Sequence, residues 1–242
     1  MEAGKCILIL GMHRSGTSCL AGSLQQHGVY LGKVFEQNPH NKKGNRENAD
    51  IMKLNNDLLE ANGGSWDQPP LEIHWDKEHE KSRDTIIEGF LEKKSVFWGF
   101  KDPRNLLTFE FWMDGLRNLN VNVVGSYRNP LLVAKSLNTR NKMSMDQGLL
   151  LWEIYNKKLI DLYETNIFPI VSFDVGVEEY HRLIYWVLHT LEITPNKNVD
   201  GPFFEESLRN RETTDSMTSL KMSNAIRMLY HKLNKIYEGQ GM

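Results

Sequence analysis

The sequence has little cysteine, no long apolar run and no excess of one charge. Its 242 residues include two cysteines, Cys6 and Cys19, so it offers no disulfide framework and we expect both thiols to be buried. No apolar run approaches the ~20 residues of a membrane-spanning helix. The net charge of −2 argues against a general nucleic-acid-binding surface. No cluster of cysteine and histidine indicates a metal site.

The remaining composition is that of an ordinary globular protein. Hydrophobic residues make up 40% of the chain and charged residues 25%. We therefore expect one domain over residues 1–242. Residues 1–5 lead straight into an apolar stretch and lack a signal-peptide layout, so we expect a cytoplasmic location.

Short apolar runs alternate with stretches of helical periodicity. Strands are predicted over residues 7–10, 95–100, 121–126 and 168–173. Helices are predicted from 17, from about 47, and over 76–94, 105–119, 144–165, 180–191 and 219–238, with another after Pro130. Residues 194–218 are polar and fit a mobile flap. The alternation favours an α/β fold with three layers, α/β/α, and a central parallel sheet.

A glycine loop joins the first strand to the first helix. The segment Gly11–Ser18 has the spacing of a P-loop, G-x-x-x-x-G-K-[ST], but Thr17 stands where the lysine should be and the cation is Arg14. Strand, glycine loop and helix direct several backbone N–H groups at one anion. The sheet is therefore expected to be like that of P-loop NTPases, with a phosphate held by Arg14, Ser15, Gly16, Thr17 and Ser18. An ordinary glycine turn remains an alternative.

Two more predicted strands end in candidate binding groups. Lys101 and Asp102 follow the second strand, and Arg128 follows the third, eight residues before Ser136. Ligands of parallel sheets bind beyond the carboxyl ends of the strands. An arginine and a hydroxyl at this spacing can hold one phosphate from two sides. The spacing alone fits equally an arginine at the sheet edge and an exposed helix serine.

Four segments in order resemble the sulfotransferases that use 3′-phosphoadenosine-5′-phosphosulfate (PAPS), bacterial-type members above all. Residues 13–18 resemble their 5′-phosphosulfate loop, and residues 127–130 with Ser136 resemble their 3′-phosphate motif. The Asn-Pro…Lys-Gly…Glu loop, here 38–47, and the Lys-Asp-Pro-Arg segment, here 101–104, are also similar. The likeness covers about residues 5–175.

The resemblance implies transfer of a sulfonate from PAPS to a hydroxyl or amine, leaving adenosine 3′,5′-bisphosphate. The developing charge on the leaving phosphate needs cations and N–H donors, and the resemblance gives Arg14 and Lys101 that role. Arg128 and Ser136 would select the 3′-phosphate. The acceptor must also lose a proton to a base, and Glu47 in the Gly…Glu pattern is the first candidate.

Other residues stay open as alternatives. Glu36 is the second candidate for the base and His40 the third, while His13 is expected to shape the loop. Arg209 and Arg211 match the family's late basic segment only weakly.

Two other functions also stay open. One is a small-metabolite kinase, with Asp102 or Asp174 as its Mg²⁺ ligand, and the other is a non-catalytic nucleotide-binding relative. The acceptor, a small molecule or a carbohydrate, would be bound by parts of 29–75 and 194–218.

Overall fold

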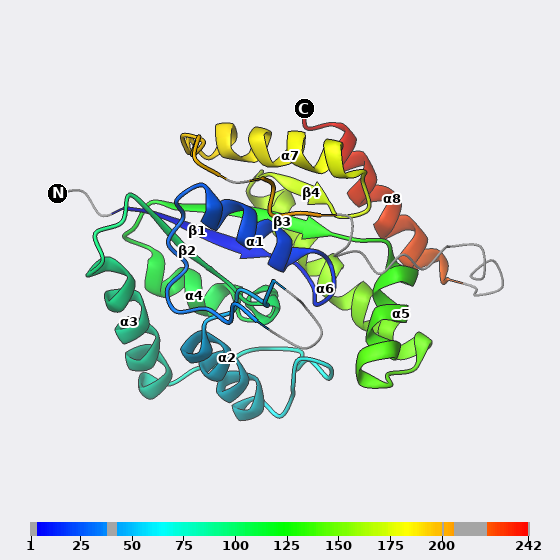
Figure 1. The fold of residues 1–242 in the computed structure, drawn as a ribbon. Coiled ribbons are helices and arrows are strands. Elements are labelled where there is room, and N and C mark those ends of the chain that lie inside the picture. Colours follow the sequence, from blue (N-terminus) through cyan, green and yellow to red (C-terminus); the bar gives the residue numbers. More distant parts are fainter. Residues whose placement is uncertain (1–3, 38–42, 200, 206–221, 242) are drawn as a thin grey trace.

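The computed structural model describes residues 4–37, 43–199, 201–205 and 222–241. The elements in chain order are β1 (Lys5–Leu10), α1 (Thr17–Gln26), α2 (Ala49–Ala61), α3 (Lys77–Leu91), β2 (Phe97–Lys101), the 3-10 helix η1 (Pro103–Leu106), α4 (Phe109–Leu116), β3 (Val121–Tyr127), α5 (Pro130–Asn141), α6 (Met145–Thr165), β4 (Ile170–Ser172), α7 (Val177–Thr190) and α8 (Asn224–Glu238). Figure 1 shows helices on both sides of one sheet.

The sheet has four parallel strands in the order β2-β1-β3-β4. β1 lies in the middle, with Cys6 opposite Trp98 of β2 and Val121 of β3. Parallel strands need crossover helices, and these cover both faces. The predicted α/β fold with a central parallel sheet is confirmed, as are its four strands.

The side chains of β1 alternate between two cores. Cys6, Leu8 and Leu10 pack with residues of α2, α4, α5 and α6, whereas Ile7 and Ile9 pack with residues of α1 and α7. Successive side chains of a strand point to opposite faces, so a strand that is buried on both faces is apolar throughout. This explains why β1 reads as one unbroken apolar run.

Both edges of the sheet have a hydrogen-bonded cover. Beside β2, the amide of Tyr30 donates to the carbonyl of Phe97 at 3.0 Å, and its carbonyl accepts from the amide of Gly99 at 3.0 Å. Beside β4, the side-chain amide of Gln240 accepts from the amide of Ile170 and donates to its carbonyl, both at 2.8 Å. The backbone groups of Phe97, Gly99 and Ile170 that face the two edges are therefore paired.

The start of α2 differs from the prediction. Glu47 does not open the helix, because the side chain of Asn48 accepts hydrogen bonds from the amides of Asp50 and Ile51 and makes Asn48 the N-cap. Asparagine is a strong N-cap residue, since its oxygen satisfies amides that have no partner within the helix. Glu47 therefore belongs to the preceding loop.

The helix predicted over 105–119 is also wrong in its bounds. The chain forms η1 first, because Asp102 accepts from the amide of Arg104 at 2.8 Å and Pro103 suits a first helical position. α4 follows over a shorter span. By contrast, the helix predicted over 144–165 is found as α6, and a capping box formed by Ser144 and Gln147 begins it.

Candidate active site

The glycine loop after β1 depends on two glycines. At Gly11, with φ +147°, a Cβ would lie 2.4 Å from the carbonyl oxygen of Ser126. At Gly16, with φ +84°, a Cβ would lie 2.3 Å from the ring of Phe173. The hydroxyl of Ser126 also donates to the carbonyl of Ser15 at 2.6 Å. The loop is thus fixed against β3 and against the residue that follows β4.

The loop ends at a helix N-terminus that no side chain caps. Gly16 is the N-cap of α1, makes no side-chain cap hydrogen bond, and is followed by no acidic residue in the first turn. Thr17 is buried and Ser18 half-buried at this end. The amides and the positive end of a helix of this length attract an anion.

An arginine cluster lies beside the loop. The Arg14 Nε donates to the Ser136 hydroxyl of α5 at 2.7 Å, and Arg128 donates to the backbone carbonyl of Arg14 at 3.5 Å. Burial, Arg140 and Arg128 lower the pKa of Arg14 to about 10. Among the described residues, Arg14 forms no ion pair with a carboxylate. Positive charge has therefore been gathered here at an electrostatic cost that an anion would relieve.

Arg128 is fixed by its neighbours. Its Nε lies 3.3 Å from the Asp174 carboxylate, its guanidinium lies 5.4 Å from the centre of the Phe173 ring, and its backbone carbonyl accepts from the Trp152 indole at 2.9 Å. Asp174 also accepts from the amide of Asn129 at 2.5 Å. Phe173, which directly follows the strand β4, is a site residue that the sequence did not predict.

Lys101 and Glu47 form a buried ion pair. The Lys101 Nζ lies 2.7 Å from Glu47 Oε1, 3.0 Å from the carbonyl of Asn45 and 3.3 Å from the Ser18 hydroxyl. Lys101 is 2% exposed and Glu47 8%. The structure therefore brings the predicted base and the predicted strand-end cation together, next to the first turn of α1.

Asp102 holds Arg104. Both carboxylate oxygens accept from the Arg104 Nη1, at 3.0 and 2.9 Å. Burial raises the pKa of Asp102, while the Arg104 charge opposes that shift. Each aspartate that the kinase alternative would use as a Mg²⁺ ligand, Asp102 or Asp174, is therefore paired with an arginine. No group of three or more potential metal ligands occurs within the described ranges.

His13 lies in an aromatic cluster. Its ring centre is 4.5 Å from that of Trp66 and 6.1 Å from that of Tyr155, and the Tyr155 hydroxyl donates to the Trp66 carbonyl at 2.9 Å. Burial, aided by the charges of Arg104 and Lys101, lowers the pKa of His13 well below its usual value. The buried Nε2 has no hydrogen-bond partner. This neutral ring joins the glycine loop to α6.

The other candidate bases lie elsewhere or are not described. The Glu36 side chain is 67% exposed and pairs with Arg46 at 3.1 Å. His40 lies outside the described residues, as do Arg209 and Arg211.

Part of the predicted flap over 194–218 is described. Phe203 and Phe204 are buried, and a Cβ on Gly22 of α1 would lie 2.2 Å from the Phe203 ring. The Lys43 Nζ donates to the Phe203 carbonyl at 2.7 Å. Residues 201–205 thus join α1 to the loop that carries Glu47. Residue 200 and residues 206–218 lie outside the described part of the chain.

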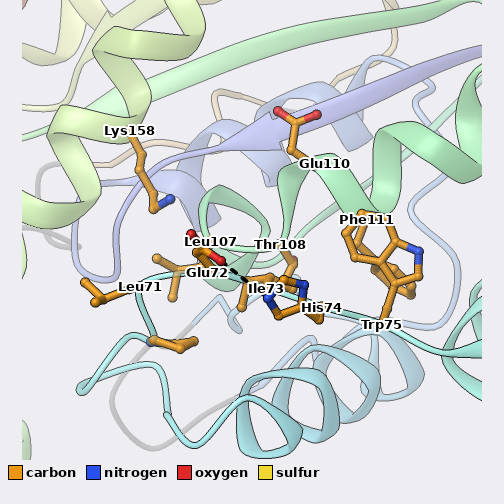
Figure 2. A pocket seen from close by; sticks show the side chains of 11 residues that line it. Leu71, Glu72, Ile73, His74, Trp75, Leu107, Thr108, Glu110, Phe111 and Lys158 are labelled. Atoms are coloured by element: carbon orange, nitrogen blue, oxygen red, sulfur yellow. Dashed lines mark ion pairs between the residues drawn. The ribbon is translucent and has the colours of Figure 1, made fainter.

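A separate pocket of about 330 Å³ lies between the segment 70–75, the start of α4 and α6. Figure 2 shows the side chains that line it, among them Ile73 and Trp75 of the segment 70–75 and Lys158 of α6. Leu71 is 98% exposed. The pocket uses one end of the region 29–75 that we expected to bind the acceptor.

The helices of the described residues also bear on the membrane prediction. None combines the length and the apolar character that a bilayer crossing requires.

Comparison with known proteins gives structural likeness only. No protein-family model matches the sequence, and no curated protein matches it. The sulfotransferase domain from the olefin synthase of Synechococcus PCC 7002 is 16% identical, with a TM-score of 0.55 over 98% of this chain and 95% of that chain. The sulfotransferase STF1 from Mycobacterium tuberculosis H37Rv is 13% identical, with a TM-score of 0.39 over 98% of this chain and 77% of that chain. The first of these shows that the chain has the fold of a sulfotransferase domain.

Proposed function

We propose that this chain transfers a sulfonate group from PAPS to a hydroxyl or an amine of a small-molecule or carbohydrate acceptor. The observation that carries the proposal is the contact between Arg14 and Ser136 beside Arg128, next to an uncapped helix N-terminus. The arginine cluster and the helix N-terminus can each bind an anion, and together they fit a nucleotide with two separate phosphates. The fold of a sulfotransferase domain supports the same function.

The donor's 5′ end is assigned to the glycine loop. Backbone amides around Gly16 and the hydroxyls of Thr17 and Ser18 would bind the phosphosulfate at the start of α1. The 3′-phosphate is assigned to Arg128 and Ser136. Arg14 belongs to the glycine loop and contacts Ser136, so its charge acts on both the phosphosulfate and the 3′-phosphate.

The transfer step needs a base and a cation at the reacting oxygens. The acceptor oxygen attacks sulfur while the bond from sulfur to the bridging oxygen breaks, and its proton passes to the Glu47 carboxylate. The electron pair leaves with the bridging oxygen on the 5′-phosphate, where Lys101 and Arg14 stabilise the developing charge. Lys101 reaches the loop in the observed structure, since it contacts Ser18.

Calorimetry with adenosine 3′,5′-bisphosphate tests the binding site. We expect the bisphosphate to bind at least tenfold more tightly than adenosine 5′-monophosphate, because the Arg128 and Ser136 site adds charge-assisted hydrogen bonds. Arg128→Ala and Ser136→Ala should reduce this preference, and Arg227→Ala on the exposed face of α8 should not. Equal binding of the two nucleotides by the native protein would contradict the assignment.

Radiolabelled PAPS with a broad acceptor panel tests catalysis. Label transfer that is lost in Glu47→Gln supports the enzyme. Bisphosphate binding without transfer to any acceptor would favour a non-catalytic relative, and turnover of Mg·ATP would favour the kinase.

A further inference from the structure

The Lys101 ammonium has already used all its hydrogen-bonding capacity. An ammonium group has three N–H donors, and Lys101 contacts three acceptors: the Glu47 carboxylate, the Asn45 carbonyl and the Ser18 hydroxyl. Any further acceptor must therefore replace one of these or share its hydrogen. Lys101 is also nearly inaccessible to water, which leaves it few other partners.

Only one of the three partners, Ser18, belongs to the glycine-loop segment Gly11–Ser18. Ser18 lies in the first turn of α1, where an anion on the loop would sit, and its contact with Lys101 is the longest of the three at 3.3 Å. Glu47 lies on the opposite loop, before α2, and its contact is the shortest at 2.7 Å. The ammonium therefore contacts both the Glu47 carboxylate and a residue at the place of an incoming anion.

We infer that Lys101 is shared in turn between Glu47 and the sulfonate donor, so that donor binding turns Glu47 into the proton acceptor. This rests on the proposed function. The donor's bridging oxygen draws the ammonium toward Ser18 and lengthens its contact with Glu47. A buried carboxylate that loses its cation gains affinity for a proton. The base is thus strengthened only when the donor is in place.

The charges balance through the step. Before binding, the Lys101 charge is compensated by Glu47. In the reaction the acceptor's proton moves to Glu47, and the electron pair of the breaking sulfur–oxygen bond moves to the leaving 5′-phosphate. Lys101 then compensates that phosphate, while Glu47 is neutral. Neither buried group is left charged and unpaired at the end of the step.

The affinity for adenosine 3′,5′-bisphosphate tests this inference. In Glu47→Gln the side chain keeps its shape but no longer competes for Lys101 as an anion, so the bisphosphate should bind roughly tenfold more tightly than to the native protein. Sulfonate transfer should fall at the same time. A variant that is merely damaged would lose both.

The control and a second variant keep the test decisive. Asp161→Asn breaks the exposed Lys157–Asp161 pair of α6 and should leave the affinity unchanged. Glu47→Asp keeps the charge but shortens the side chain, so its contact with Lys101 is weakened and the bisphosphate should bind severalfold more tightly. This variant provides the test if Glu47→Gln does not fold.

The possible outcomes separate the two proposals. Affinities of both Glu47 variants within twofold of the native value would overturn the sharing of Lys101 and leave the proposed function intact. No binding of the bisphosphate to the native protein would overturn the proposed function itself.

Discussion

Two groups of basic residues meet at the same edge of the sheet, and they differ in how their charge is compensated. Lys101 ends β2 and Arg104 follows it, and each is matched by a buried carboxylate, Glu47 and Asp102 respectively. Arg14, between β1 and α1, has a hydroxyl as its side-chain partner, and burial together with the neighbouring arginine charges lowers its pKa. Lys101 and Arg104, the β2 group, are stable without a ligand. Arg14 with Arg128 and Arg140, the Arg14 group, has one carboxylate partner among the described residues, Asp174 on Arg128, and is arranged for an anion from outside.

The difference indicates what each group contributes. A cation that is paired with a carboxylate can exchange that partner for a ligand during a reaction, because a partner of opposite charge is close throughout. Uncompensated charges provide standing affinity for an anionic ligand. In the proposed enzyme, the affinity for the donor would come mainly from the Arg14 group. The exchange of partners during the reaction would take place at Lys101 and Glu47.

The largest expected effect comes from breaking the compensated group. Lys101→Met should reduce the free energy of unfolding by about 3–5 kcal/mol, because Glu47 is left buried without a cation. Replacing both partners, Lys101→Met with Glu47→Leu, should recover most of that loss. Urea denaturation measures the free energy of unfolding of the single and the double variant. Lys157→Met in the exposed pair of α6 is the control and should cost less than about 1 kcal/mol. A similar cost for both lysines would mean that the buried pair has no special weight.

The Arg14 group should respond in the opposite way. Arg14→Gln should leave the free energy of unfolding unchanged or raise it slightly, because it removes repulsion with Arg128 and Arg140. The affinity for adenosine 3′,5′-bisphosphate should fall roughly tenfold to a hundredfold, the worth of hydrogen bonds to a charged group. Calorimetry on the folded variant separates the two effects. Loss of stability without loss of affinity would reverse our interpretation of the cluster.

His13, between the two groups, should make stability depend on pH. Its pKa is lowered in the folded protein, so below about pH 6.5 the unfolded chain binds a proton that the folded chain does not. Stability should therefore fall as the pH drops, by about 1.4 kcal/mol per pH unit from this residue. His13→Phe keeps a ring against Trp66 and should remove that part of the slope. An unchanged slope would show that other groups cause it.

The smallest expected effect is at Arg140. This residue is exposed near the end of α5, so water and salt screen its charge. Arg140→Ala should weaken bisphosphate binding about twofold to threefold in low salt and less in high salt. A titration series in potassium chloride measures this. A salt-independent loss would indicate direct contact with the ligand.

Most of the fold could be predicted from the sequence because burial leaves a clear pattern. β1 is apolar because it is covered on both faces, and the capping box of α6 is a local signal that needs no tertiary context. The start of α2 could not be placed, because Glu47 and Asn48 are both compatible with a helix N-terminus. The structure decides between them, because the Asn48 side chain caps α2 and Glu47, in the preceding loop, pairs with Lys101 of β2.

The candidate site was predictable as a location but not as a set of contacts. Residues that follow parallel strands converge at one edge, so Arg14, Lys101 and Arg128 could be expected to lie near each other. Which partner each side chain takes depends on packing between distant segments. Nothing local links Arg14 to Ser136, and nothing in a polar stretch marks Phe203 as buried.

The covers beside β2 and β4 have a consequence for how molecules of this protein meet one another. Open strand edges invite pairing with a second chain and the growth of aggregates. Here a single residue, Tyr30 or Gln240, occupies the first position where such a strand would add. Removing Gln240 would leave the edge at β4 open. We expect the shortened protein to keep its fold but to be less soluble.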